Sequence, residues 1–217
     1  MTRRARASVF TVAGLAAAYA WVGRPWQLHW GATAAEVEVP LPGDDLLPHP
    51  DVVATRAITV QASPGQVWPW IVQLGQGRGG FYSYDWLENL VGCRIHSAGR
   101  IVPEWQNLRV GDEVRLAPEV GLEVAQLAPA GALVLRGGVP IGSTPPPYDF
   151  TWAFVLQATN PEVTRLLVRE RWQYTRAWTW LMVEPMEAIS FVMHQRMLRG
   201  IRDRVAAGSM PAATHDP

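Results

Sequence analysis

The sequence predicts one α+β domain, on three observations. After residue 61 the hydrophobic period changes from the alternation of a strand to the spacing of a helix. Between residues 113 and 174, short strand patterns follow one another with Pro and Gly between them, which is typical of an antiparallel meander. Residues 184–206 then carry a long helical pattern. A chain of 217 residues has room for one such domain and a tail.

The amino-terminal segment, residues 1–24, predicts a membrane anchor. A basic lead precedes an uncharged run between Arg6 and Arg24, which is near the lower limit of the roughly 17 to 25 residues that span a bilayer. We therefore expect a span at residues 8–23, with the excess of Arg before it placing the domain outside the cytoplasm. A cleaved signal peptide and a buried Ala-rich helix are the alternatives, and without an anchor the protein would be cytoplasmic.

Residues 25–55 predict a Pro-rich linker. Prolines at positions 40, 42, 48 and 50 prevent a continuous helix or a central strand. Asp44 and Asp45 do not lie in a loop of alternating oxygen donors, so a calcium site is not expected. Leu46 and Leu47 would lay this linker along the surface of the domain.

The stretch from Ala57 to Leu90 predicts a strand, a helix, a glycine-rich loop and a second short helix. The strand covers residues 57–61, where β-branched side chains alternate with polar ones. Ser63 and Pro64 are typical of a helix start, and the helical spacing continues up to Gly75. The second helix follows at about residues 83–92.

The same stretch resembles a known family. ITVQASPGQVWPWIVQLG is similar to the opening of the START-like (SRPBCC) polyketide cyclase/dehydrase and lipid transport superfamily. FYSYDWLENLVG and RIVPEWQNLRVGDEVRL resemble a bacterial subgroup whose members mostly have no assigned activity. The resemblance implies a helix-grip fold, a curved antiparallel β-sheet wrapped around a long C-terminal helix with a cavity between them. It places the ligand-binding domain at residues 56–206 and leaves a flexible tail at 207–217.

The body of the domain predicts five strands and one candidate acid or base. The strands are Glu113–Ala117, Leu122–Leu127, Ala132–Arg136, Tyr148–Gln157 and Val163–Tyr174. In the last strand, alternation places Glu170 on the apolar face. Burial there raises the pKa of a carboxyl group unless a positive partner compensates. The alternatives are an ion pair with an arginine such as Arg136, or a bulge that turns Glu170 to solvent.

The final helix predicts either a ligand surface or ordinary packing on the sheet. It is expected at Glu184–Ala206, with Pro185 at its start and Gly208 after its end. One stripe carries Met186, Ile189, Met193, Met197 and Ile201, with His194 at its edge. Methionine side chains adapt to irregular guests, so a cavity between helix and sheet would suit this stripe.

Several functional classes are excluded by composition and motif. Arginine and acidic residues balance at 19 each with no lysine, which argues against a nucleic-acid-binding protein. The single Cys93 and five scattered histidines fit no metal cluster, and no cofactor is expected. GQGRGG follows a helix instead of a strand, so it does not predict dinucleotide binding. No G-x-S-x-G motif occurs, so the sequence does not predict a hydrolase with a serine nucleophile.

The leading hypothesis is the binding or transport of a small-to-medium hydrophobic molecule, such as a lipid, isoprenoid or polyketide, at a membrane. An alternative is a cyclase or dehydratase in which Glu170 transfers protons, with help from tyrosines or His96. A third possibility is an interaction module without ligand. The sequence indicates no oligomeric state. The candidate ligand-binding residues are Tyr82, Tyr84, Trp86, His96, Glu104, Trp105, Arg136, Trp152, Phe154, Trp172, Tyr174, Met193, His194 and Met197.

Overall fold

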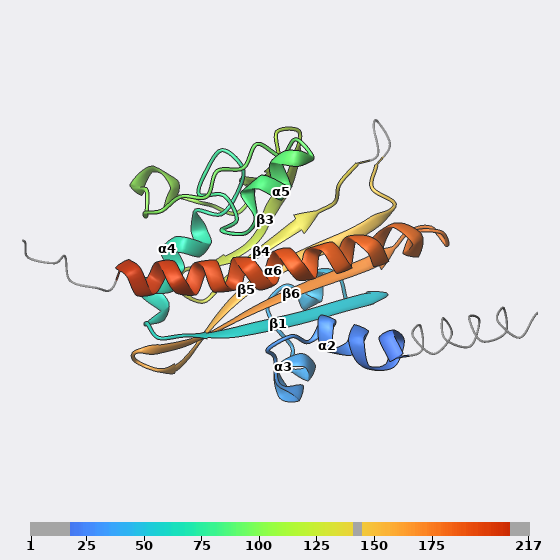
Figure 1. Ribbon diagram of the computed structural model, residues 1–217, viewed down its shortest axis with the longest axis horizontal. Coiled ribbons are helices and arrows are strands. Elements are labelled where there is room, and N and C mark those ends of the chain that lie inside the picture. The colour runs from blue at the N-terminus through green and yellow to red at the C-terminus, as the bar shows by residue number, and fades with distance from the viewer. Residues whose placement is uncertain (1–17, 141–144, 209–217) are drawn as a thin grey trace, which may run out of the picture.

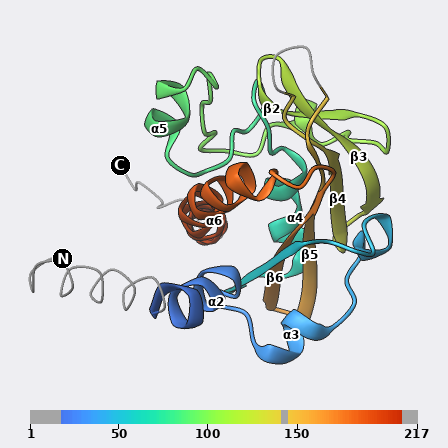
Figure 2. The same ribbon diagram turned by 90° about the vertical axis from the view of Figure 1, so that its right-hand side faces the viewer.

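The computed structural model describes residues 18–140 and 145–208, and they form a curved antiparallel sheet around one long helix. The sheet has the strand order β1-β6-β5-β4-β3-β2. Figure 2 looks along α6 and shows the sheet curving around it, with α5 above α6 in this view. The predicted α+β, helix-grip architecture is confirmed. The strands are β1 (Val52–Val60), β2 (Glu113–Ala117), β3 (Val120–Ala128), β4 (Ala132–Gly137), β5 (Tyr148–Asn160) and β6 (Val163–Tyr174).

The helices lie along the concave face and at the amino end of the chain (Figure 1). They are η1 (Tyr19–Gly23), α2 (Arg24–Leu28), α3 (Ala34–Glu38), η2 (Asp44–Leu46), α4 (Pro64–Val72), α5 (Asp85–Leu90), η3 (Pro103–Trp105) and α6 (Trp180–Gly208). The predicted start of α4 is confirmed. The Ser63 backbone N–H donates to the Gln66 side chain at 3.0 Å, and Pro64 occupies the first turn.

The long helix α6 begins at Trp180, about one turn before the predicted Glu184. The backbone N–H groups of Met182 and Val183 both donate to the Thr179 carbonyl at 3.0 Å, which forms the extra turn. Pro185 lies inside the helix because a proline near the helix start removes few hydrogen bonds. The start predicted at Glu184 was therefore too late.

Pairing of the first strand with the last brings distant residues together. Arg56 of β1 pairs with Val168 of β6, while Ala54 pairs with Glu170. Side chains two positions apart along paired strands share a face and are diagonal neighbours. Arg56 and Glu170 are consequently neighbours on the concave face, although 114 positions separate them in sequence.

The Pro-rich segment after α3 packs on the opposite face of the sheet. Leu41 joins a buried cluster with Leu167 and other residues of the sheet. Asp44 accepts hydrogen bonds from Arg169 at 2.6 Å and Arg171 at 3.1 Å, and Arg169 also donates to backbone carbonyls of this segment. The arginine face of β6 is thus covered, with Asp44 as its main acidic partner.

The predicted membrane span at residues 8–23 is corrected by the structure. Within residues 18–140 and 145–208, no helix combines the length and the apolar character that a bilayer crossing requires. Residues 1–17 lie outside the described residues, and they include most of the predicted span. Just after the predicted span, Arg24 donates two hydrogen bonds to Glu184 of α6, at 2.6 and 3.0 Å. The expectation of a domain placed outside the cytoplasm by this span is withdrawn.

Candidate functional site

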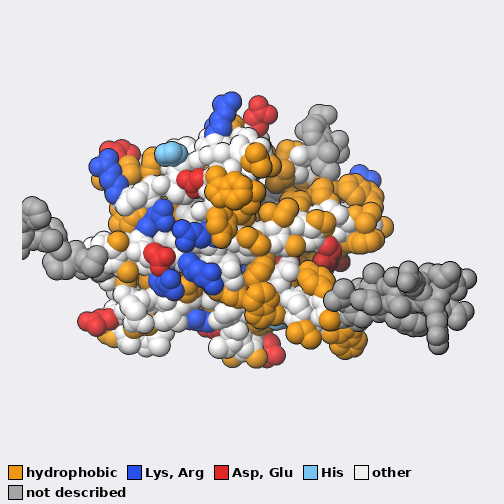
Figure 3. Space-filling view, viewed as in Figure 1, with side chains coloured by type: hydrophobic (Ala, Val, Ile, Leu, Met, Phe, Trp, Pro, Cys, Tyr) orange, Lys and Arg blue, Asp and Glu red, His pale blue; other side chains and the backbone are white. Residues whose placement is uncertain are grey.

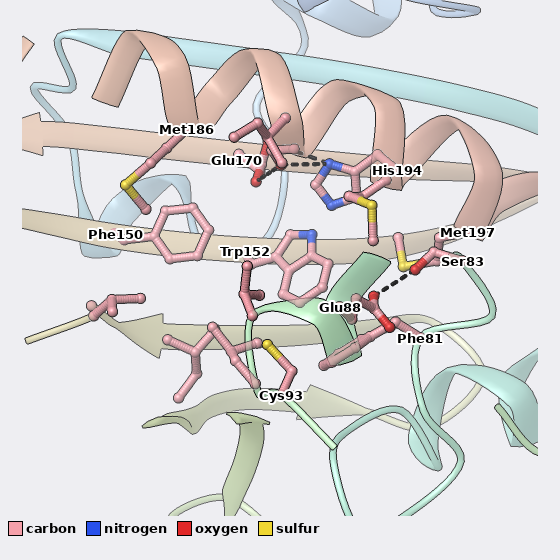
Figure 4. A pocket seen from close by; sticks show the side chains of 18 of the residues that line it. Phe81, Ser83, Glu88, Cys93, Phe150, Trp152, Glu170, Met186, His194 and Met197 are labelled. Atoms are coloured by element: carbon pink, nitrogen blue, oxygen red, sulfur yellow. Dashed lines mark hydrogen bonds and ion pairs between the residues drawn. The ribbon is translucent and has the colours of Figure 1, made fainter. Parts of the chain in front are cut away.

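A cavity of about 520 Å³ lies between the concave face of the sheet and α6 (Figure 4). Strands β5 and β6 supply aromatic side chains, α6 supplies methionines, and the region of α5 closes another side. Its lining residues are Phe81, Ser83, Leu87, Glu88, Val91, Cys93, Leu116, Leu122, Gly138, Val139, Tyr148, Phe150, Trp152, Glu170, Trp172, Met186, Ile189, Ser190, Met193, His194 and Met197.

The aromatic wall follows from strand alternation. Phe150, Trp152 and Phe154 share the concave face of β5, and Trp172 of β6 lies beside Phe150 on the same face. The ring centroids of Phe150 and Trp172 lie 4.3 Å apart, and those of Trp152 and Phe154 lie 4.7 Å apart. Contacts at these distances between tilted rings hold the side chains in fixed positions. The wall is therefore a preformed apolar surface.

The cavity opens between α5 and the first half of α6. Val91 and Ile189 both line the cavity, yet their side chains are 77% and 61% exposed. Apolar side chains gather over the right-hand part of the molecule in Figure 3, where α6 begins, whereas most of the arginine side chains in view lie further to the left. The opening thus has an apolar rim.

The polar part of the cavity wall between β6 and α6 consists of Glu170, Ser190 and His194. Ser190 Oγ donates to Glu170 Oε1 at 2.8 Å and lies 3.1 Å from His194 Nδ1. Glu170 Oε2 lies 3.4 Å from His194 Nδ1. The imidazole also packs on Trp152, with 5.2 Å between ring centroids. This group is the main interruption of an otherwise apolar lining.

Behind this wall, the buried Arg56 binds both acidic side chains of the region. Its Nη1 donates to Glu170 Oε2 at 2.9 Å and lies 3.0 Å from His194 Nδ1. Its Nη2 donates to Glu187 of α6, and its Nε donates to the Gln27 carbonyl at 3.1 Å. Gln27 also donates its side-chain amide to Glu187. Each guanidinium nitrogen thus has a partner, as a buried charge requires.

The two carboxyl groups differ in their pKa. Burial acts to raise the pKa of Glu170, but its polar neighbours, Arg56 and Ser190 among them, lower it to about 2. Burial raises the pKa of Glu187, and Arg56 only partly offsets this. Glu170 is therefore ionised at neutral pH.

Among the described residues, no group of three or more acidic, His or Cys side chains has a metal-binding arrangement.

A second polar pair lies on the α5 side of the cavity. Ser83 Oγ donates to Glu88 Oε1 at 2.6 Å, while the buried Glu88 Oε2 has no hydrogen-bond partner among the described residues. Burial raises the pKa of the Glu88 carboxyl, as does the nearby Asp85. Cys93 also lines this side, and burial raises the pKa of its thiol.

Six of the candidate catalytic and ligand-binding residues predicted from the sequence line the cavity. They are Trp152, Glu170, Trp172, Met193, His194 and Met197. Glu170 lies among apolar side chains as alternation predicts, and its positive partner is Arg56. Arg136, the partner considered from the sequence, is exposed and lies beside a second, polar cavity of about 620 Å³.

The other candidates do not line the cavity. Tyr82 is buried, where its hydroxyl donates to the Trp70 carbonyl at 3.1 Å and accepts from Gln73 at 2.9 Å. Phe154 is fully buried beneath Trp152. Besides Arg136, the exposed ones are Trp86, His96 and Glu104, and the half-buried ones are Tyr84, Trp105 and Tyr174.

Sequence reasoning missed Arg56 and Glu187. The signal for Arg56 was its place two residues before Ile58, on the apolar face of the same strand, but the strand was predicted to start at residue 57. Glu187 is seven residues from His194, two turns away on the same helix face. The predicted stripe was centred on methionines, so Glu187 and His194 were not recognised as a buried polar pair.

Comparison with known proteins gives only distant similarity to solved structures. No family model and no curated protein matches the chain. A protein of Mesorhizobium loti is 11% identical, with a TM-score of 0.45 over 73% of this chain and 100% of that one. Norcoclaurine synthase of Thalictrum flavum is 13% identical, with a TM-score of 0.45 over 73% and 96%. The di-domain ARO/CYC protein BexL is 10% identical, with a TM-score of 0.45 over 74% of this chain and 48% of its own length.

The assignment of the fold therefore depends on the chain's own architecture. The sheet curved around the long α6 is the feature that the sequence resemblance implied, and the strand order with β1 beside β6 comes from the structure. The chain has a helix-grip fold.

Proposed function

We propose that this protein binds or carries a medium-sized apolar molecule in the cavity between the sheet and α6. The observation that supports this most is the cavity itself, about 520 Å³ with a lining that is almost entirely apolar. A guest there removes its own apolar surface and that of the cavity wall from water, at about 25 cal/mol per Å². The apolar rim at Val91 and Ile189 suits the entry of such a guest.

The state of Glu170 supports carriage over proton-transfer catalysis. A catalytic acid or base works best with a pKa near the working pH. With a pKa of about 2, Glu170 has no proton to donate at neutral pH and is a weak base. Its two oxygens already accept hydrogen bonds from Ser190 and Arg56. The cyclase or dehydratase alternative would need another group at the cavity.

Binding of fluorene, a rigid hydrocarbon without hydrogen-bonding groups, tests the proposal. Equilibrium dialysis with the full chain should give saturable binding with one site. Met193→Trp should fill the cavity and weaken binding at least tenfold, because Met193 lines it from α6. Val192→Trp is the matched control, since the neighbouring Val192 is 45% exposed and does not line the cavity.

Two outcomes contradict the proposal. One is that the wild type does not bind fluorene or any compound of this size. The other is that Met193→Trp, with an unchanged thermal transition, binds as well as the wild type. Native mass spectrometry of protein purified from its own host would then show whether a hydrophobic molecule co-purifies.

A further inference from the structure

The network around His194 fixes which of its ring nitrogens carries a proton. A guanidinium group can only donate hydrogen bonds, and Arg56 Nη1 lies 3.0 Å from Nδ1. The two hydrogens of this Nη1 serve Glu170 Oε2 and His194 Nδ1, while its neighbours Nη2 and Nε bind elsewhere. Nδ1 therefore accepts and Nε2 carries the ring proton, so the hydrogen bonds from Arg56 and Ser190 are what stabilise the ionised Glu170 in this arrangement. This assignment comes from the hydrogen-bond network.

The second ring nitrogen, Nε2, is left as a donor at the cavity. In Figure 4 one nitrogen of His194 faces Glu170, and the other lies on the opposite edge of the ring, turned towards the cavity. Across residues 18–140 and 145–208, no hydrogen bond to this Nε2 is formed. His194 is 4% exposed and lines the cavity, so water reaches it only through that space.

Other groups on this wall are also donors without acceptors. The indole Nε1 atoms of Trp152 and Trp172 are buried and have no partner in the described part of the chain. The Tyr148 hydroxyl accepts from the Val139 N–H at 3.1 Å and keeps its own hydrogen. The two oxygens of Glu170, by contrast, are both occupied. A buried donor without an acceptor is costly, so this wall lacks hydrogen-bond acceptors.

The charge on Glu170 limits which acceptor fits. A ligand carboxylate bound to Nε2 would lie on one side of the imidazole ring, while the ionised carboxylate of Glu170 is buried on the other side. Like charges in a weakly screened interior repel each other strongly. A neutral oxygen avoids this cost, and the apolar remainder of the cavity suits the carbon skeleton.

On these grounds, and resting on the proposed function, we propose that the natural ligand is a neutral carbonyl compound, of the ketone or quinone type. Its oxygen accepts a hydrogen bond from His194 Nε2, and its apolar body lies against Trp152, Trp172 and the methionines of α6. His194 is then the residue that orients the ligand, and Arg56 fixes the imidazole by binding Nδ1.

Three compounds of nearly equal shape test this inference. Fluorene has no hydrogen-bonding group, 9-fluorenone adds an acceptor oxygen, and carbazole has a donor N–H instead. Equilibrium dialysis with the wild-type protein should show fluorenone binding about three- to tenfold more tightly than fluorene, the net effect of one hydrogen bond. Carbazole should bind no better than fluorene, because it would set a donor against a donor.

Two substitutions locate the effect. His194→Gln keeps an amide nitrogen near the position of Nε2 and an oxygen that can accept from Arg56, so it should retain part of the preference for fluorenone. His194→Phe keeps the bulk of the ring without its donor, so the ratio of the fluorenone and fluorene affinities should fall to about one. Circular dichroism and thermal unfolding show whether each variant is folded. If His194 had only a structural role, its substitution would weaken the binding of fluorene and fluorenone equally, and the ratio of their affinities would not change.

The outcomes separate this inference from the proposed function. If fluorene, fluorenone and carbazole bind the wild type equally, the carbonyl inference is wrong and apolar binding stands. If carbazole binds most tightly, its N–H meets an acceptor, either His194 Nε2 or Glu88 Oε2, which is unpartnered among the described residues, and the inference is also wrong. If none of the three binds, the proposed function itself fails. Should His194→Phe not fold, the three-compound comparison on the wild type still decides.

Discussion

Replacing Glu170 by Gln should reveal how strongly the buried network depends on one negative charge. Glu170 is 3% exposed, so solvent screens its interactions little. Its pKa is about 2 in the folded protein, against 4.5 for the ordinary carboxyl group. Folding therefore favours the ionised form. Gln keeps the shape and one acceptor oxygen but carries no charge to pair with Arg56.

The size of the effect follows from linkage between protonation and folding. A fall in pKa from 4.5 to about 2 corresponds to roughly 3 kcal/mol, at about 1.4 kcal/mol per pH unit. Because the folded pKa is depressed, this stabilisation is fully present above pH 4.5. It is lost as the pH falls from 4.5 towards 2. The free energy of unfolding of Glu170→Gln should thus lie about 3 kcal/mol below the wild type at pH 6, and by pH 3 less than half of that difference should remain.

Urea denaturation at pH 6, 4.5 and 3, followed by circular dichroism, measures the difference between the two proteins. Comparison at each pH removes most of the contribution of Glu187, since both proteins carry it. Glu123→Gln, at an exposed strand position, is the control and should follow the wild type throughout. An equal stability of Glu170→Gln and wild type at pH 6, or a gap that stays constant down to pH 3, would refute the reasoning.

Two further substitutions test packing and hydrogen bonding in the same region. Gly200→Ala should lower the free energy of unfolding by about 1–3 kcal/mol, because a Cβ there would overlap the carbonyl oxygen of Tyr82, whereas Gly208→Ala, with open space around it, should be neutral in the same urea titration. Ser190→Ala removes a hydrogen bond to the ionised Glu170 and should cost about 1.5–3 kcal/mol at neutral pH, so an unchanged denaturation midpoint would contradict the role given to this hydroxyl.

Local patterns in the sequence predicted the elements of the fold well, because each pattern depends on nearby residues. Strands Glu113–Ala117 and Val163–Tyr174 have the predicted bounds, and α5 lies inside the predicted range. The placement of Glu170 on an apolar face also came from alternation alone.

The partners of the site could not be predicted in this way, since they depend on long-range pairing. Arg56 meets Glu170 only because β1 pairs with β6, and the sequence does not give this register. The buried face of α6 also differs from the face that the sequence predicted. Glu187 and His194 face the sheet, whereas Ile189, assigned to the inner stripe, is 61% exposed at the cavity rim. A stripe defined by hydrophobicity alone misses polar residues that are buried in pairs.

The contacts between α2 and α6 determine which wall of the cavity can move. Moving α6 outward would break the Arg24–Glu184 pair and separate Gln27 and Arg56 from Glu187. The opposite side is α5, six residues long and with none of them buried. We therefore expect thermal breathing, and with it the admission and release of guests, to occur by displacement of α5, while α6 and the strands behind it stay still.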